Sequence, residues 1–433
     1  MELRYGRGAL TVHLPPKVKA TVIRKPAMPV LPDAASAVAA ALEEPVGARP
    51  LREEARGRRS ACVLVCDITR PVPNALVLPA VLRALLRGGL EPDDIRLLVA
   101  TGLHRPNVGA ELEELVEDQW VLETFRVENH DARDDAAHLD LGRTARGTPV
   151  KIDRRFALAD LRIVTGLVEP HFMAGYSGGR KVIAPGVAHQ DTIKSLHNSR
   201  IMAHPRAESC VLEGNPLHEE QLAIARLVGP ALSVNTVLDE GRRLSFVSYG
   251  ELLAAHERAV AFAHRYAVVP VPRRFGTVVT SAAGYPLDKT YYQTVKGMVG
   301  PLDILSPDAD LIIASQCSEG MGSREFVDAQ RRLVRLGVEG FLHEIAEKPL
   351  ADIDEWQTQM QVRPMRRARV HLFSDGLDPA DHGLTGVDLV SSVAEAVEAS
   401  VRRTLDPAVA VIPEGPYLVP LFRPRVRAHL PTP

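Results

Sequence analysis

The sequence has no marked excess of charge and no long apolar run. Its formal net charge is −2 and its pI is about 6.7, which argues against nucleic acid or an anionic membrane as a partner. No apolar stretch is long enough to cross a bilayer, and the first residues lack the apolar core and small-residue cleavage site of a signal peptide. We therefore expect a cytoplasmic protein that binds neither nucleic acid nor a membrane.

Cysteine is also scarce. The four cysteines, Cys62, Cys66, Cys210 and Cys317, are too few and too scattered for a disulfide framework. Cys62 and Cys66 lie in one apolar segment and would share a face of a strand. Because paired cysteines with zinc-site spacing are absent, we predict buried free thiols.

The remaining composition is that of an ordinary globular protein. The chain has 433 residues, 45% hydrophobic and 24% charged, and exceeds what one core usually supports. Apolar strands alternate with helices, which predicts an α/β fold: two α/β domains with mostly parallel sheets and a cleft between them. A proline-broken segment at 267–274 places the boundary there. We expect an N-terminal domain of residues 1–268 and a C-terminal domain of residues 269–433, with the last segment packing back on the first domain.

Periodicity locates the individual elements. The predicted strands include 61–66, 95–100, 161–168, 277–281, 311–315, 370–374 and 409–412. The other predicted elements are hairpins over 1–15 and 232–247 and helices over 35–43, 76–88, 109–119, 187–198 and 388–404.

Polar clusters follow three of the predicted strands. They are Asp67 with Thr69 and Arg70, Gly102 with His104, and Glu169 with His171. In a parallel sheet, ligands bind beyond the carboxyl ends of the strands. Three strand ends that deliver arginine and two histidines to one edge predict a site there.

The third strand runs into a glycine-rich segment that ends in a lysine. Ser177, Gly178 and Gly179 precede Lys181 by a few residues, an arrangement that aims backbone N–H groups and a cation at an anion. It is not a Walker A loop, because Val182 follows the lysine. From residues alone, a lysine that contacts a phosphate without covalent chemistry is favoured.

Histidines and cations suggest the chemistry. His104 and His171 in one pocket could move a proton in either direction. For His197, one helix further on, metal ligation and helix capping are equally favoured by the spacing. Arg70 and Lys296 are candidate clamps for an anion, with surface ion pairs as their alternative. Together these residues suggest proton or hydride chemistry on a small carboxylate. We interpret the other histidines as hydrogen-bonded structural residues: His130, His138, His204, His218 and His382.

Taken together, the motifs resemble the nickel-dependent lactate racemase family, whose members are nickel-pincer nucleotide-dependent racemases and epimerases of 2-hydroxy acids. The matching segments fall in family order, and they are Asp67-Ile-Thr-Arg-Pro71, Gly102-Leu-His-Arg-Pro106, Glu169 to Lys181, Leu196-His-Asn198 and Tyr292-Gln-Thr-Val-Lys296.

The resemblance implies specific roles. Lys181 would carry the nickel-pincer nucleotide covalently, with Asp67, Thr69, Ser177, Gly178 and Gly179 around it, and His197 would bind nickel. His104 and His171 would be the alternating acid and base. Arg70 and Lys296 would hold the substrate carboxylate, with Tyr292 and Gln293 lining the pocket and Trp356 on the substrate side.

The same resemblance implies the reaction. Reversible hydride transfer to the tethered cofactor turns a 2-hydroxy acid into a planar keto acid and avoids a carbanion. Two histidines are then needed, one for each enantiomer. Enzymes that synthesise the cofactor and insert nickel would be maturation partners. Aromatic residues at 176, 291 and 292 leave open a substrate larger than lactate.

Two alternatives remain open at this point. One is a zinc-dependent hydrolase or lyase that uses His104, His171 and His197 as ligands, although the spacing typical of zinc sites is absent. The other is a non-catalytic protein that binds a carboxylate or nucleotide.

Overall fold

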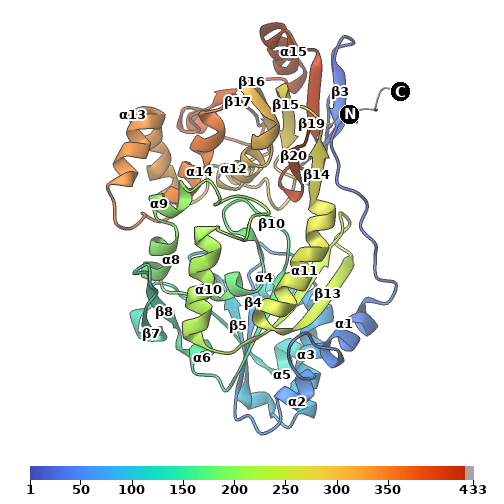
Figure 1. The fold of residues 1–433 in the computed structure, drawn as a ribbon, viewed down its shortest axis with the longest axis vertical. Helices are drawn as coiled ribbons and strands as arrows, with labels where there is room; N and C mark the ends of the chain where they lie inside the picture. Colours follow the sequence, from blue (N-terminus) through green and yellow to red (C-terminus); the bar gives the residue numbers. More distant parts are fainter. Residues whose placement is uncertain (425–433) are drawn as a thin grey trace, which may run out of the picture. The chain divides into compact units, whose positions relative to one another are not determined.

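The computed structural model describes residues 1–424 and divides the chain into two compact units. Ala27–Tyr266 form one, the N-terminal unit (Figure 1). Met1–Pro26 and Ala267–Pro433 form the other, the C-terminal unit. The predicted break near residue 267 agrees with this division, whereas residues 1–26, which we assigned to the first domain, cluster with the second unit. Those residues belong with the second unit because the strand Lys19–Val22 pairs there.

The N-terminal unit is built on a six-stranded, mostly parallel sheet. Its strand order is β13-β12-β9-β4-β5-β6, and only the β12–β13 pairing is antiparallel. These strands are β4 (Ala61–Cys66), β5 (Ile95–Ala100), β6 (Arg126–Asn129), β9 (Leu161–Leu167), β12 (Leu232–Leu238) and β13 (Leu244–Glu251).

Two small hairpins accompany this sheet, β7 (His138–Arg143) with β8 (Pro149–Asp153) and β10 (Pro170–His171) with β11 (Gly175–Tyr176). The helices of this unit are α1 (Ala34–Glu43), α2 (Leu51–Glu54), α3 (Asn74–Arg87), α4 (Ala110–Val116), α5 (Gln119–Thr124), α6 (Arg154–Ala157), α7 (Arg180–Ile183), α8 (Gln190–Leu196), α9 (Ser199–Met202), α10 (Pro216–Val228) and α11 (Leu252–Ala267).

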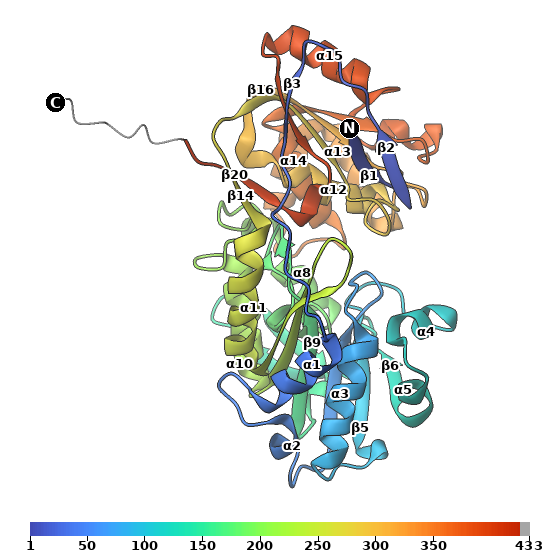
Figure 2. The ribbon, with the colours of Figure 1, turned by 90° about the vertical axis from the view of Figure 1, so that its right-hand side faces the viewer.

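One large apolar core lies between this sheet and its N-terminal helices. Leu78, Val81, Leu82 and Leu85 of α3 are fully buried in one cluster with residues of β4, β5 and β9. Figure 2 shows α3 alongside this sheet. The four side chains recur at three- and four-residue spacing, as an amphipathic helix on a sheet requires.

The chain order of the strands fixes where a ligand can bind. From β4 the chain moves outward to β5 and β6, and then returns to place β9 and β12 on the other side of β4. Strand order therefore reverses between β4 and β9. In open α/β sheets the crevice beyond the carboxyl ends of the strands at such a point is the usual binding site.

The C-terminal unit has a second six-stranded sheet, and every pairing in it is parallel. Its order is β18-β17-β16-β15-β19-β3. The strands are β3 (Lys19–Val22), β15 (Phe275–Ser281), β16 (Leu305–Ala314), β17 (Ala368–Phe373), β18 (Asp388–Leu389) and β19 (Ala408–Ile412), and the helices are α12 (Tyr291–Val299), α13 (Arg324–Ala346), α14 (Glu355–Met365) and α15 (Val393–Thr404).

The predicted N-terminal hairpin is confirmed as β1 (Glu2–Tyr5) with β2 (Gly8–Thr11). Its turn lies against the second sheet, where the Gly6 amide donates to Asp288. The last strand, β20 (Val419–Phe422), pairs with β14 (Val268–Val271), and both strands fall within the C-terminal unit. Residues 425–433 lie outside the described part of the chain.

Three predicted helices have different bounds. The span 109–119 holds α4 and the start of α5, because Glu117 takes a left-handed conformation and ends the first helix. The span 187–198 contains only α8, which starts after His189. The span 388–404 begins as strand β18, so Leu389 pairs in the sheet, and the helix starts after Ser392, whose side chain accepts the Glu395 amide.

No helix among residues 1–424 is long and apolar enough to span a bilayer. The four cysteines are free thiols, and Cys62 and Cys66 are buried in β4 as predicted.

Candidate functional site

The three predicted strand ends do lie at one edge of the first sheet. β9, β4 and β5 are neighbours and run parallel, so the segments that follow them start side by side. The prediction of a shared edge is confirmed, and it coincides with the reversal of strand order between β4 and β9.

Asp67 joins two of these segments. Its Oδ2 lies 2.5 Å from Nδ1 of His104, and its Oδ1 accepts a hydrogen bond from the Thr69 hydroxyl at 2.6 Å. Burial works to raise the pKa of Asp67, but the charge and hydrogen bond of His104, together with Thr69, outweigh it and hold the pKa below its ordinary value.

This pairing decides which nitrogen of His104 can act. A carboxylate at Nδ1 holds the proton of the neutral ring there, so the lone pair is on Nε2. The His104 side chain is half exposed whereas Asp67 is buried. His104 therefore has a carboxylate partner at Nδ1 and an exposed ring whose Nε2 can accept a proton, as a general base requires.

His171 is held differently. It ends β10, pairs with Gly175 of β11, and is buried. Its Nδ1 accepts from the backbone amides of Met173 and Ala174, at 3.3 and 3.2 Å. Because amides can only donate, Nδ1 holds a lone pair and the neutral ring carries its proton on Nε2. The two candidate acid–base histidines therefore differ in tautomer.

The glycine segment then turns into a one-turn helix, α7. Gly178 and Gly179 have positive φ angles of 74° and 51°, a conformation that glycine adopts without strain. A Cβ at Gly179 would lie 2.7 Å from the ring of His256, so packing also requires glycine. The Ser177 hydroxyl donates to the Leu167 carbonyl at 2.7 Å, and it closes the loop on the end of β9.

Lys181 occupies the second position of α7 and is partly buried. Burial, followed by the charges of Arg70 and Arg180, lowers its pKa from 10.5 to about 7. An amine with this pKa is about half neutral at pH 7, and the neutral form is nucleophilic. Lys181 is therefore a candidate for covalent chemistry.

Two arginines add to the positive charge. Among residues 1–424, Arg70 forms an ion pair with Glu169 alone, at 3.8 Å, and its side chain is 17% exposed, so this pair is largely buried and not at the surface. Arg180 is buried, and its guanidinium has no carboxylate within 4 Å among the described residues. Burial lowers the pKa of Arg180 to about 9.

His197 closes α8 as its C-cap residue, and its side chain is buried. Its Nδ1 faces the Ile193 carbonyl at 2.8 Å, donates to it, and leaves the lone pair on Nε2. Burial lowers the pKa of His197 to about 4, to which the charge of Lys181 contributes. Capping and ligation therefore do not exclude each other, because a backbone carbonyl at one nitrogen is the usual partner of a metal-binding imidazole.

The predicted substrate residues Tyr292, Gln293 and Lys296 lie on α12 of the C-terminal unit. Gln293 and Tyr292 precede Lys296 by three and four residues, so each is a neighbour of Lys296 on the helix surface. The Oε1 of Gln293 is buried and has no hydrogen-bond partner among the described residues. Trp356 starts the neighbouring helix α14, whose Gln357 donates to the Tyr292 carbonyl at 2.5 Å. The structure thus brings the helix of Trp356 against the helix of Lys296.

Two aromatic residues do not act as expected. Tyr176 is buried and its hydroxyl lies 2.7 Å from Nδ1 of His264. Tyr291 is fully buried and donates to the Thr385 carbonyl at 2.8 Å. Both hydroxyls serve packing within their own units, so neither residue supports a larger substrate.

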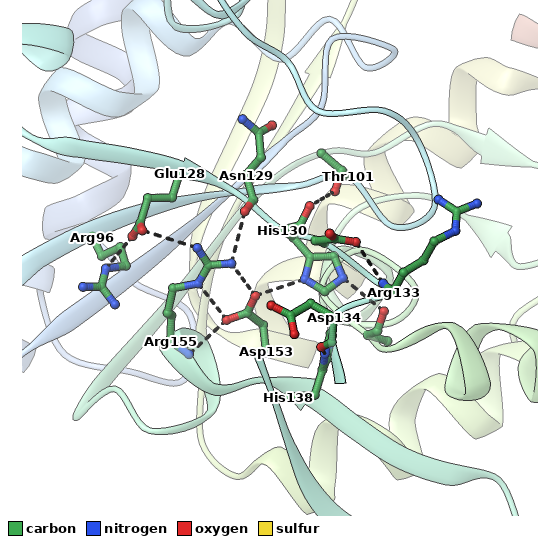
Figure 3. Close-up of polar contacts among 12 residues, drawn as sticks. Arg96, Thr101, Glu128, Asn129, His130, Arg133, Asp134, His138, Asp153 and Arg155 are labelled. Atoms are coloured by element: carbon green, nitrogen blue, oxygen red, sulfur yellow. Dashed lines mark hydrogen bonds and ion pairs between the residues drawn. The ribbon is translucent and has the colours of Figure 1, made fainter. Parts of the chain in front are cut away.

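Most histidines set aside as structural have hydrogen-bond partners. His130 is buried between the Asp153 carboxylate and the Ala188 carbonyl, each 3.1 Å from a ring nitrogen (Figure 3). His138 donates to the Asp134 carbonyl, His204 accepts the Arg206 amide, and His382 faces the Leu377 carbonyl. His218 differs, because its Nδ1 is buried without a partner in the described part of the chain.

Within residues 1–424, no group of three or more histidine, cysteine, aspartate or glutamate side chains is placed to hold a metal ion. A zinc site needs His104, His171 and His197 to converge, so the geometry does not support the zinc alternative.

Two residues of the site were missed from the sequence. Arg180 lies inside the glycine–lysine motif, and its position between Gly179 and Lys181 was a signal that could have been used. His256 comes from α11, and its Nε2 donates to the Ser177 carbonyl at 2.8 Å. Nothing in the sequence around His256 connects it with the motif.

Comparisons with known proteins agree with this geometry. Residues 5–210 match the lactate racemase N-terminal domain and residues 273–419 match the lactate racemase C-terminal domain. A lactate racemase of Lactiplantibacillus plantarum is 32% identical over 389 residues, which cover 86% of this chain and 88% of that protein. A lactate racemase of Thermoanaerobacterium thermosaccharolyticum is 29% identical over 436 residues, 96% of this chain and 97% of that protein.

Solved structures show the same relationship. The lactate racemase apoprotein from Thermoanaerobacterium thermosaccharolyticum has a TM-score of 0.88 at 27% identity, over 97% of this chain and 99% of that one. A crystal structure of a Thermotoga maritima protein, 17% identical with a TM-score of 0.68 over 90% of this chain and 98% of that one, shares the fold. The chain belongs to the lactate racemase family.

Proposed function

We propose that this protein is an isomerase that racemises or epimerises a 2-hydroxy acid, either lactate or a larger relative. The single observation that carries the proposal is the pair His104 and His171. They follow β5 and β9, the two strands that flank β4, at the sheet edge from which the glycine segment leads to Lys181, whose pKa is lowered. A reaction that inverts a carbon centre needs a proton-transferring group for each enantiomer.

The residues present fit a nickel-pincer nucleotide. Lys181 has the lowered pKa of an amine that can be acylated, and His197 has its lone pair on Nε2. Arg180, His256 and Asn235 each have a buried polar atom without a partner among the described residues, all near the Gly178–Lys181 segment. When bound, the cofactor supplies the hydride acceptor, with nickel held by His197.

The chain itself handles the protons. His104 receives the substrate hydroxyl proton on Nε2, and Asp67 stabilises the imidazolium that results. The same imidazolium returns the proton in the reverse direction. His171 serves the hydroxyl of the other enantiomer. We therefore assign Asp67 the role of partner to His104. Its contribution to the cofactor site is indirect and depends on that contact.

We assign the substrate carboxylate to Arg70 and Lys296. A guanidinium binds a carboxylate bidentately and an ammonium adds a point charge. Holding the carboxylate keeps the planar keto acid in place while its carbonyl turns from one histidine to the other. Tyr292 and Gln293, on the helix face of Lys296, would line the pocket, and the unpartnered Oε1 of Gln293 is suited to a substrate hydroxyl.

Two relatives are named lactate racemase, and lactate is the first substrate to test. The cofactor requirement makes enzymes of cofactor synthesis and nickel insertion the expected maturation partners. The experiment is a chiral assay of a panel of single-enantiomer 2-hydroxy acids, with protein produced alongside those enzymes. Conversion of at least one acid in both directions is expected. Release of a hydrolysis or elimination product, or binding without conversion across the panel, would reject the proposal.

A further inference from the structure

Arg180 is an unusual residue for its surroundings. It is 1% exposed, and no carboxylate among the described residues lies within 4 Å of it. Burying an unpaired guanidinium is costly unless hydrogen bonds replace its water. Arg180 recovers part of this cost from backbone carbonyls: Nη1 donates to Tyr176 at 3.0 Å and Nη2 to Ala174 at 2.8 Å.

Those two carbonyls belong to the turn that holds His171. The β10–β11 hairpin pairs His171 with Gly175, and the turn between its strands presents the Met173 and Ala174 amides to Nδ1 of His171. Ala174 is therefore held on both sides, with its N–H on the histidine and its C=O on the arginine. Arg180 also precedes Lys181 in α7. The Arg180 side chain therefore connects the β10–β11 hairpin to the helix that carries Lys181.

We propose that Arg180 is a positioning residue for His171: by fixing the Ala174–Tyr176 turn, it holds the Met173 and Ala174 amides on Nδ1 and so keeps the ring as the Nε2–H tautomer. The assignment rests on the proposed function for its catalytic meaning. The tautomer itself is a property of the chain and needs no cofactor.

This has a consequence for the reaction. A ring protonated on Nε2 donates a hydrogen bond to a carbonyl, and to receive a proton on Nε2 it must first carry its hydrogen on Nδ1, where the amides point. His104, with Asp67 at Nδ1, has the opposite arrangement. The resting enzyme therefore holds one base and one hydrogen-bond donor, and the turn opposes the base form of His171.

The chain offers a matched control. Arg162 is also an arginine of the N-terminal unit that donates to backbone carbonyls, to Ala157 at 3.2 and 2.8 Å and to Pro230 at 3.2 Å. Burial lowers its pKa, as it does that of Arg180. Arg162 starts β9 at the end opposite the site, so Arg162→Met loses the same kind of contact without reaching the turn.

The test is the tautomer of His171 in the full-length apoprotein, measured from long-range ¹H–¹⁵N correlations of ¹⁵N-histidine-labelled protein, with His171→Gln to assign the signal. Wild type is expected to prefer Nε2–H by about tenfold or more, since two amide contacts favour it. Arg180→Met should bring the two tautomers to within about threefold. Arg180→Lys, which keeps a donor, should lie between, and Arg162→Met should match wild type.

An Nδ1–H ring in the wild-type apoprotein would overturn the proposal even if no variant folds. So would an unchanged tautomer in folded Arg180→Met, because a merely structural arginine would lower stability without moving the ring. In cofactor-loaded enzyme, Arg180→Met should change the ratio of the two kcat values for a pair of enantiomers, whereas kcat/KM must stay equal in both directions. Absence of racemase activity with the predicted tautomer intact would reject the proposed function and leave this inference standing.

Discussion

Two polar regions of the N-terminal unit differ in how their charges are balanced. The first, the Asp153 network, consists of Arg96, Glu128, His130, Asp153 and Arg155 (Figure 3). Each charged group in it meets an opposite one: Arg155 bridges Asp153 at 2.6 Å and Glu128 at 3.5 Å, and Arg96 meets Glu128 at 2.8 Å. The second, the Lys181 site, consists of Asp67, Arg70, Glu169, Arg180 and Lys181.

At the Lys181 site the cations outnumber their partners. Asp67 is committed to His104 and Thr69, Glu169 lies 3.8 Å from Arg70, and Arg180 has no carboxylate within 4 Å in the described part of the chain. The pKa values differ accordingly. Burial raises the pKa of Asp153, but Arg155 and His130 outweigh it and keep the pKa well below its ordinary value. The pKa of Lys181 is lowered to about 7.

On the proposed function, this difference separates a structural region from a functional one. A balanced buried network holds the fold together, and removing one member leaves another charge stranded. A surplus of buried cations costs stability until an anion arrives, as expected where a phosphate-bearing cofactor and a carboxylate substrate bind.

The largest expected effect falls on rate. His104→Ala and His171→Ala should each lower kcat by about 10²- to 10⁴-fold in both directions, because each histidine is needed in every turnover. A chiral assay of both enantiomers measures this. The matched control is His130→Ala, which should lower stability and leave the kcat of the folded fraction unchanged. Full activity of either site variant would contradict the assignment.

Breaking the Asp153 network should lower the free energy of unfolding instead of the rate. Asp153→Asn leaves His130 without its carboxylate and Arg155 with Glu128 alone, and we expect a loss of about 3–5 kcal/mol in the free energy of unfolding. Glu169→Gln is the comparison at the site and should change stability by about 1 kcal/mol or less, because its ion pair is long and partly exposed. Denaturant titration of the two variant apoproteins measures both losses in the free energy of unfolding. Equal losses would contradict the distinction between the two regions.

Arg70→Ala tests the cation surplus through binding. Loss of a charge-assisted contact to the substrate carboxylate should raise KM by about 10- to 100-fold, equivalent to about 1.5–3 kcal/mol. Stability should change little, since Arg70 pairs only at 3.8 Å. Steady-state kinetics measures KM, and an unchanged KM would show that Arg70 does not bind the substrate carboxylate.

A smaller effect concerns pH. The folded-state pKa of Lys181 is lowered, so its burial penalty is complete below pH 7, shrinks as pH rises from about 7 towards 10.5, and vanishes above. Lys181→Met apoprotein should therefore be more stable than wild type at pH 6, by about 1–3 kcal/mol after allowance for partial exposure, with the gain shrinking towards pH 10. A gain that does not depend on pH would show that Lys181 has an ordinary pKa.

The sequence predicted the strand ends at the candidate site better than it predicted the domain boundaries. Apolar runs that end in Asp67, His104 and Glu169 mark strand ends directly, because a buried parallel strand and the polar turn after it contrast in composition. Residues 19–22 carry no such contrast: β3 is a short strand whose four residues are all exposed, and only its pairing with β19 places residues 1–26 in the C-terminal unit.

The sequence also could not predict the direction of individual side chains. Tyr176 and Tyr291 lie within or beside the motifs, yet their hydroxyls bond within their own units. The composition of the motif does not distinguish Arg180, since only the fold shows that its side chain is buried whereas Lys181 next to it is partly exposed. Spacing gives the position of a residue along the chain, and packing decides the partner of its side chain.

The central claim is that Lys181 carries the cofactor. Intact-protein mass with metal analysis tests it most directly, on active protein made together with the cofactor-synthesis enzymes. We predict a mass increase that peptide mapping places on Lys181, about one nickel per chain, and neither in Lys181→Ala. An active preparation with an unmodified Lys181 would contradict the account.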